Sequence, residues 1–123
     1  MFIMIRGDPR TKKNSQRLMR FGCRIVPMYS QAFEQYREDF LRQVTGDKKR
    51  GISFPVNVKC VYFMRTRRKV DLVNLLEATN DLLVDAGVLA DDNSMIVAGH
   101  DGSRVSYDRI DPRVEIEIKE VWE

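Results

Sequence analysis

Apolar residues recur every three or four positions in two stretches of the chain, which is the spacing of amphipathic helices. The first stretch begins after Ser30, a residue type that caps helices, and runs to Gly46, which favours a helix end. The second runs from residue 71 to Gly87, and its apolar positions share one arc when each residue is advanced by about 100°. The pattern therefore predicts two helices, each with one face in a core. The apolar positions are Phe33, Tyr36, Phe40, Leu41 and Val44 in the first helix, and Leu72, Leu75, Leu76, Thr79, Leu82, Leu83 and Ala86 in the second.

Shorter apolar or alternating runs predict β-strands. They cover residues 1–6, 55–64, 95–98 and 113–121, and the run at 55–64 is predicted as a central strand because it is rich in β-branched and aromatic residues. Residues 18–27 favour a small hairpin around Gly22. A length of 123 residues suits one core rather than two. The sequence thus predicts a single α+β domain over residues 1–123, with a small mixed β-sheet and two main α-helices.

Two polar segments between these elements are strongly basic. Residues 11–17 contain no apolar residue, and residues 65–69 hold four cations in five positions. Neither composition suits a protein interior, so both segments are predicted as exposed loops that can contact phosphates. A solvated basic surface explains the first segment equally well. The candidate DNA-contacting residues are Lys12, Lys13, Asn14, Arg17, Arg65, Arg67, Arg68 and Lys69.

The sign of the charge changes after residue 70. Residues 1–70 hold 17 lysines and arginines against five acidic residues, a net charge of +12, and residues 71–123 hold four against 13, a net charge of −9. A basic surface attracts polyanions and clustered carboxylates attract divalent cations, and enzymes that act on nucleic acids need both. Two solvated faces that attract each other would have the same composition, so that alternative stays open.

The composition also excludes several kinds of site. Cys23 and Cys60 are the only cysteines, and their spacing fits neither a disulfide framework nor a metal knuckle. His100 is the one histidine, and no suitable serine accompanies the pair that it forms with Asp101. No apolar run approaches the roughly 20 residues of a membrane span, and no basic-then-apolar leader precedes the first strand. We therefore expect a soluble, cytoplasmic protein whose metal chemistry depends on carboxylates.

Carboxylates gather at two places that can converge in the fold. Asp71 stands at the start of the second predicted helix, and Asp91 and Asp92 lie in a predicted turn after its end. Mg²⁺ prefers oxygen donors and typically takes one or two carboxylates together with water and phosphate oxygens. A helix cap at Asp71 and ordinary turn chemistry at Asp91 and Asp92 are the alternatives. Asp71 shares an acidic arc of the helix with Asn74, Glu77, Asp81 and Asp85.

The order of these features resembles the RusA family of Holliday junction resolvases, the crossover junction endodeoxyribonucleases, over nearly the whole chain. That family has a basic stretch leading into Asp-x-Asp-Asn-x-x-Lys-x-x-x-Asp on a helix, then a glycine and an Asp-Asp pair. From residue 67 this chain reads RRKVDLVNLLEATNDLLVDAGVLADD. The resemblance implies metal-binding catalytic roles for Asp71 and Asp92, with Asp91 as an adjacent carboxylate. The positions that match without gaps are Asp71, Asn74, Asp81, Gly87, Asp91 and Asp92, where Asn74 and Asp81 are supporting residues.

Two positions depart from the family motif, as in a divergent member. Val73 stands where the motif has its second aspartate, and Glu77 stands where it has a lysine. Because Glu77 lies on the same arc as Asp71, we expect Glu77 to replace the missing metal ligand. A residue of the basic loop such as Lys69 would then supply the cation that the motif lysine would otherwise provide.

The resemblance also implies cofactors, partners and an origin. We expect Mg²⁺, or Mn²⁺ in its place, and a homodimer that nicks opposed strands of a four-way DNA junction during recombination and repair. The residues TKKNSQR, from position 11, resemble the substrate-contacting region near the family's N-terminus. A bacterial or prophage origin follows, with neither a membrane nor a small-molecule substrate as partner. A non-catalytic protein that binds branched DNA and a protein-interaction module remain the alternatives.

Overall fold

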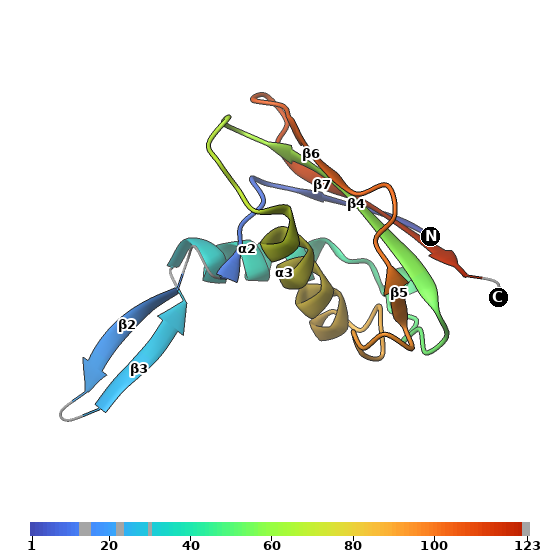
Figure 1. Ribbon diagram of the computed structural model, residues 1–123, viewed down its shortest axis with the longest axis horizontal. Coiled ribbons are helices and arrows are strands. Elements are labelled where there is room, and N and C mark those ends of the chain that lie inside the picture. The colour runs from blue at the N-terminus through green and yellow to red at the C-terminus, as the bar shows by residue number, and fades with distance from the viewer. Residues whose placement is uncertain (13–15, 22–23, 30, 122–123) are drawn as a thin grey trace.

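The computed structural model is organised around β4 (Val56–Met64), which lies in the middle of a five-stranded mixed sheet (Figure 1). One neighbour is β7 (Arg113–Glu120), antiparallel to β4, and β1 (Phe2–Arg6) follows β7 at the sheet edge. On its other side β4 pairs in parallel with β5 (Val97–Gly99) and β6 (Arg104–Tyr107). The prediction of a small mixed sheet with a central strand at 55–64 is confirmed.

Both helices cover the same face of this sheet (Figure 1). They are α2 (Gln31–Gln43) and α3 (Leu72–Asp85), and a 3₁₀-helix, η1 (Gly46–Lys48), follows α2. Alternate residues of β4 point at the helices because side chains on a strand alternate between faces. These residues of β4 are all buried, namely Val56, Val58, Cys60, Tyr62 and Met64. In the described part of the chain, no helix combines the length and the apolar character needed to cross a membrane.

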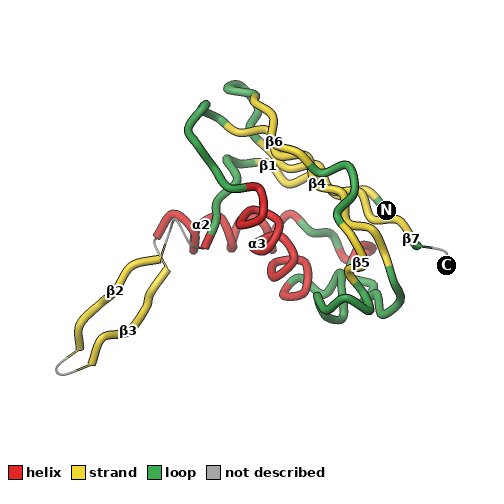
Figure 2. The backbone as a smooth tube through the Cα atoms, in the orientation of Figure 1, coloured by secondary structure: helices red, strands yellow, loops and turns green. Residues whose placement is uncertain are grey.

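A two-stranded hairpin stands clear of this body (Figures 1 and 2). It consists of β2 (Gln16–Phe21) paired antiparallel with β3 (Arg24–Tyr29). The structure describes residues 1–12, 16–21, 24–29 and 31–121, with the backbone alone for the hairpin strands. The hairpin prediction is confirmed, whereas the exposed loop predicted over residues 11–17 is wrong at both ends. Thr11 is buried, and residues 16 and 17 are paired in β2.

A further correction concerns the chain after α3. Gly87 has φ of +81°, a conformation that suits glycine, and ends the helix as predicted. The strand predicted at 95–98 begins later, because Met95 lies in a turn with 73% of its surface exposed. The strand β6 was not predicted, because it is only four residues long and its two apolar residues, Val105 and Tyr107, are too few to establish an alternating pattern. This stretch, which contains little regular structure, places Asp92 beside Asp81 of α3.

Candidate functional site

Asp71 begins α3 and serves as its N-cap. Its Oδ1 atom accepts a hydrogen bond of 2.9 Å from the backbone N–H of Val73. The capping alternative foreseen for Asp71 is therefore real, although this bond uses a single carboxylate oxygen. The side chain is exposed at the point where the basic loop of residues 65–69 leads into the helix. Asp71 thus remains accessible to a ligand while it fixes the first turn of α3.

Farther along α3, a pair of carboxylates comes together from separate segments. Asp92 lies beside Asp81, and we call these two residues the acidic pair. The pKa of the Asp92 carboxyl is raised, first by partial desolvation and then by hydrogen bonding with and repulsion from Asp81, with a further contribution from Asp91. Lys12 Nζ lies 2.6 Å from the Asp81 Oδ2 atom, and both side chains are about one-third exposed. A single ammonium therefore contacts a cluster with more negative than positive charge.

Asp91 is engaged by its own turn. Its Oδ1 atom accepts a bond of 2.7 Å from the Asp92 backbone N–H, and its Oδ2 atom accepts one of 3.0 Å from Asn93 Nδ2. These bonds lower the pKa of Asp91, because they stabilise the charged carboxylate. The side chain of Asn93 in turn accepts the Met95 N–H at 2.9 Å. Asp91 thus shapes the turn that presents Asp92.

The predicted metal ligands are spread along α3. Asp71 precedes Asp81 by ten residues, which corresponds to about 15 Å along a helix axis. Glu77 lies between them, exposed, one turn before Asp81 on the same stripe as Val73. No group of three or more histidine, cysteine or acidic side chains in the described residues is arranged to hold a metal ion. The structure thus brings Asp92 next to Asp81 and Asp91, but neither these three residues nor Asp71 and Glu77 with them form such a group among the described residues.

The acidic pair nevertheless meets the simpler requirement of Mg²⁺, which commonly takes only one or two carboxylates and completes its shell with water and phosphate oxygens. Hard carboxylate oxygens are the correct donor type, and two carboxylates from separate segments lie side by side with the Lys12 ammonium at one of them. The donor chemistry of Asp81 and Asp92 therefore fits a divalent ion of this class.

The basic loop of residues 65–69 is exposed, as predicted, and is anchored by Asp8. Asp8 Oδ1 accepts the Arg65 backbone N–H at 2.9 Å, and Oδ2 lies 3.1 Å from Arg68 Nη1. The Asp8 side chain is only 9% exposed, and Arg10 Nη2 lies 3.7 Å from it. Sequence reasoning missed this anchor. The available signal was that Asp8 is the one acidic residue among the first 33.

The candidate DNA-contacting residues divide into three groups. Arg65, Arg67, Arg68 and Lys69 lie in the exposed loop. Lys12 contacts Asp81, so the structure places Lys12 rather than Lys69 at the acidic stripe of α3. Lys13 and Asn14 fall outside the described residues, as does the side chain of Arg17.

The supporting residue Asn74 is half-buried on α3.

His100 has a structural position. Its Nδ1 atom lies 2.8 Å from the carbonyl oxygen of Val58, and its Nε2 atom lies 3.1 Å from Asn80 Nδ2. A carbonyl only accepts, so Nδ1 carries the proton and Nε2 accepts from Asn80. The ring therefore connects the end of β5 to β4 and α3, in keeping with the expectation that His100 is not part of a catalytic triad.

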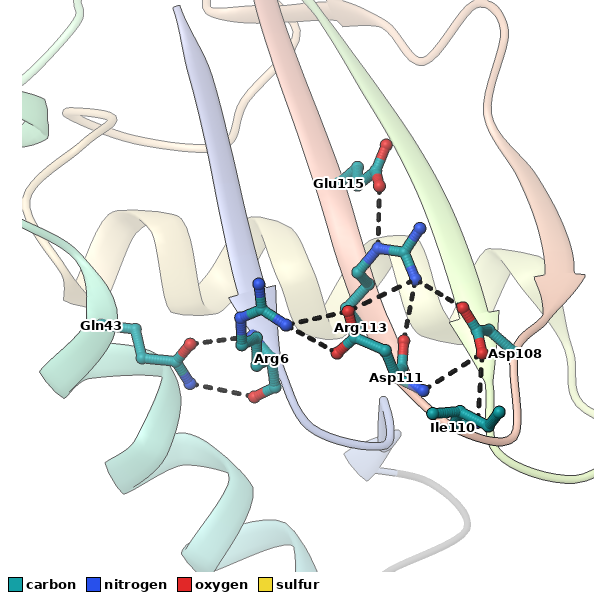
Figure 3. Close-up of polar contacts among 7 residues, drawn as sticks. All are labelled: Arg6, Gln43, Asp108, Ile110, Asp111, Arg113 and Glu115. Atoms are coloured by element: carbon teal, nitrogen blue, oxygen red, sulfur yellow. Dashed lines mark hydrogen bonds and ion pairs between the residues drawn. The ribbon is translucent and has the colours of Figure 1, made fainter.

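A second acidic cluster, at the other end of the sheet, is closed by arginines (Figure 3). Arg113 donates from Nη1 to Asp108 Oδ2 at 2.9 Å and from Nε to Glu115 Oε2 at 2.8 Å. Arg6 Nη1 reaches both carboxylate oxygens of Asp111 at 2.8 Å. The pKa of Asp108 is lowered, chiefly by the Asp111 backbone N–H and then by Arg113. We call Asp108, Asp111 and Glu115 with Arg6 and Arg113 the arginine cluster.

Comparison with known proteins adds one finding. The family model described as endodeoxyribonuclease RusA matches residues 6–119, a range that contains every element from β2 to β6 in full, together with the acidic pair. A search of curated proteins found no significant match.

Proposed function

Because the chain belongs to the RusA endodeoxyribonuclease family, we propose that it is a divalent-metal-dependent endonuclease that resolves Holliday junctions by paired nicks in recombination and repair. The observation that carries this proposal is the acidic pair. Asp92 has a raised pKa beside Asp81, and a strongly basic loop leads into the same helix. The arrangement provides for both partners of the reaction, the metal ion and the phosphate backbone.

In this proposal, Asp92 holds the ion together with Asp81, and Asp71 and Glu77 are the further ligand candidates on α3. A bound Mg²⁺ or Mn²⁺ would polarise an attacking water and offset the negative charge that develops at the phosphate. Asp91 positions Asp92 through the turn that its carboxylate stabilises. The spread of these residues along α3 is compatible with a phosphodiester that lies along the helix stripe, with water completing the shell of the ion.

In this proposal, Lys12 supplies the positive charge that the family motif provides with a lysine at the position of Glu77. Its ammonium already lies at Asp81, one turn beyond Glu77 on the acidic stripe. With Asp81 holding a divalent ion, the attraction between Lys12 and Asp81 would weaken, and the Lys12 ammonium would be available to a phosphate oxygen of the strand. A lysine from the segment that follows β1 would thus take the place of the lysine that the family motif has on the helix.

The basic loop guides the DNA backbone toward Asp71. Arg65 and Arg68 are held by Asp8, so the loop presents its cations in a fixed arrangement. A four-way junction has two equivalent strands to cut, and a two-fold homodimer can bring one site to each. We include the homodimer in the proposal for that reason.

One observation favours a second candidate, a protein that binds branched DNA without cutting it. Val73 is 68% exposed on the first turn of α3, at the motif position of the second aspartate. An aliphatic side chain there cannot coordinate an ion, whereas the basic loop needs no metal to bind phosphate.

The test is cleavage of a synthetic four-way junction with and without Mg²⁺. We expect the wild type to cut only with the ion, and Asp92→Asn and Asp71→Asn to lose at least about 100-fold of the rate while they still bind the junction. Asp108→Asn is the matched control, because this carboxylate belongs to the arginine cluster, and it should cut normally. A folded wild type that binds junctions and never cuts them would establish the second candidate.

A further inference from the structure

A hollow of about 470 Å³ lies between the basic loop and β6. Val105 and Tyr107 of β6 pair with Tyr62 and Met64 of β4, so alternation places them on the face of the sheet that the helices cover elsewhere. At this end of the sheet they remain 38% and 36% exposed. The volume falls within the range of sites that bind small organic groups, about 300–1,000 Å³.

The wall of this hollow is a stacked pair. The guanidinium carbon of Arg67 lies 4.3 Å from the centroid of the Tyr107 ring. A guanidinium plane over an aromatic ring is a surface on which a further flat π-system can stack. None of the ion pairs in the described residues involves Arg67, so its charge is not neutralised by a carboxylate there.

Polar groups surround the stack. Thr66 and Ser106, which are polar residues, and Arg68, which carries a second guanidinium, are among the residues that line the hollow. Arg68 is held by Asp8 at 3.1 Å and also donates to Thr66 Oγ1 at 3.2 Å. The rim is therefore built before any ligand arrives, which lowers the entropy cost of binding.

The chemistry of this hollow selects one class of ligand. A flat stacking surface favours an aromatic ring, two guanidiniums favour an anion near that ring, and hydroxyls favour polar ring edges. A nucleotide combines all three features, whereas an acidic peptide lacks the ring and an apolar ligand lacks the charge. Arg67 precedes Asp71 by four residues, so their Cα atoms are no more than about 14 Å apart.

We propose that the hollow between Arg67 and Tyr107 binds a single unpaired nucleotide, whose base stacks on this pair and whose phosphate contacts Arg68. This inference rests on the proposed function, in which the DNA is a four-way junction. The nucleotide is then one that is unpaired at the branch point of the junction. Duplex DNA keeps its bases stacked in the helix and cannot fill the hollow without the cost of unstacking. The hollow thus gives preference for branched over linear DNA.

The test measures DNA binding without any divalent ion, so that it does not depend on cleavage. The probes are a four-way junction with 2-aminopurine at the branch point, a single-stranded thymidine pentanucleotide and a linear duplex. The variants are Tyr107→Leu, which removes the ring, and Tyr107→Phe, which keeps it. Phe2→Leu is the matched control, because Phe2 is an aromatic residue, 50% exposed, on β1 at the far edge of the sheet.

We expect Tyr107→Leu to weaken binding of the junction and the pentanucleotide by about tenfold and to leave duplex affinity unchanged. The wild type, Tyr107→Phe and Phe2→Leu should quench 2-aminopurine on binding, and Tyr107→Leu should not. Equal losses for duplex and junction, or unchanged quenching in a folded Tyr107→Leu protein, would overturn the nucleotide site. These outcomes are separate from cleavage, since a protein that cuts junctions can lack the site and one that never cuts can possess it.

Discussion

The acidic pair and the arginine cluster contain the same kind of side chain in opposite electrostatic states. In the arginine cluster, Asp108 has a lowered pKa, because N–H donors and Arg113 stabilise its charge. In the acidic pair, Asp92 has a raised pKa, because desolvation and Asp81 disfavour its charge. The number of carboxylates is therefore a poor guide to function in this chain. A better guide is whether arginines and N–H donors of the molecule stabilise their charge, and the proposed cation site is the pair of carboxylates that lacks such partners for Asp92.

The largest expected effect is stabilisation by a divalent ion. An ion that binds only the folded state at 100 times its dissociation constant raises the free energy of unfolding by about 2.7 kcal/mol. We expect Mg²⁺ or Mn²⁺ to raise the free energy of unfolding by this amount in the wild type and in Asp108→Asn, as measured by urea unfolding. In Asp92→Asn most of this stabilisation should be lost. An equal rise in Asp92→Asn would show that the ion binds elsewhere.

The next largest effect is expected in the arginine cluster. Arg113→Met removes several hydrogen bonds to charged partners and leaves Asp108 and Glu115 without their cation, so we expect a loss of about 2 kcal/mol in the free energy of unfolding. Methionine keeps much of the volume over the Phe63 ring, which lies 3.9 Å from the guanidinium carbon. Urea unfolding without metal measures the loss. If Arg113→Met were as stable as the wild type, the arginine cluster would not stabilise the fold.

A smaller effect is expected at Lys12. The pair that Lys12 forms with Asp81 is partly exposed, so Lys12→Met should change the free energy of unfolding by less than about 1 kcal/mol. Removal of a competing ammonium should tighten Mg²⁺ binding by roughly fivefold, which titration calorimetry can measure. Lys48→Met, which also removes a surface lysine paired with an aspartate, is the control and should leave the ion affinity unchanged. Weaker ion binding by Lys12→Met would contradict the proposed exchange.

The smallest effect is a difference in pH dependence. The raised pKa of Asp92 stabilises the fold below the unfolded pKa of about 3.9, and this contribution is lost as the pH rises through the folded value. Asp108 behaves in the opposite way, because its lowered pKa stabilises the fold above about 3.9 and the contribution is lost as the pH falls through the folded value. Carbon-13 carboxyl titration by NMR without metal should place Asp92 above Asp108. A pKa of Asp92 below that of Asp108 would contradict the proposed difference between the acidic pair and the arginine cluster.

Much of the fold followed from local patterns. The arc of leucines in α3 and the apolar run of β4 identify these elements because burial of one face is encoded every few residues. The order of strands could not be predicted, since β1 pairs with β7 across more than a hundred residues. The strand β6 was missed because it has only four residues, most of them exposed, and its pairing with β4 rather than burial of one face defines it.

The site followed only in part. The roles of Asp71 and Asp92 as metal ligands stay predictions from their positions and from the family motif, whereas the alternative role of Asp71 as the cap of α3 is confirmed. The contact of Lys12 with Asp81 joins residues 69 positions apart, and such pairs leave no local pattern in a sequence. The same holds for Asp8 and the basic loop. Contacts that neutralise a charge over long separations decide which carboxylates stay unsatisfied, and these contacts become visible only in the folded chain.

The segment of residues 8–12 joins the two charged regions that the proposed reaction requires. Asp8 holds the basic loop at one end, and Lys12 holds Asp81 at the other. Four peptide units span at most about 14 Å, so the segment acts as a short tether and neither contact can shift far without pulling on the other. If the loop binds DNA and α3 holds an ion, as proposed, this tether would link the two binding events thermodynamically. By reciprocity, the factor by which the ion alters DNA affinity must equal the factor by which DNA alters ion affinity.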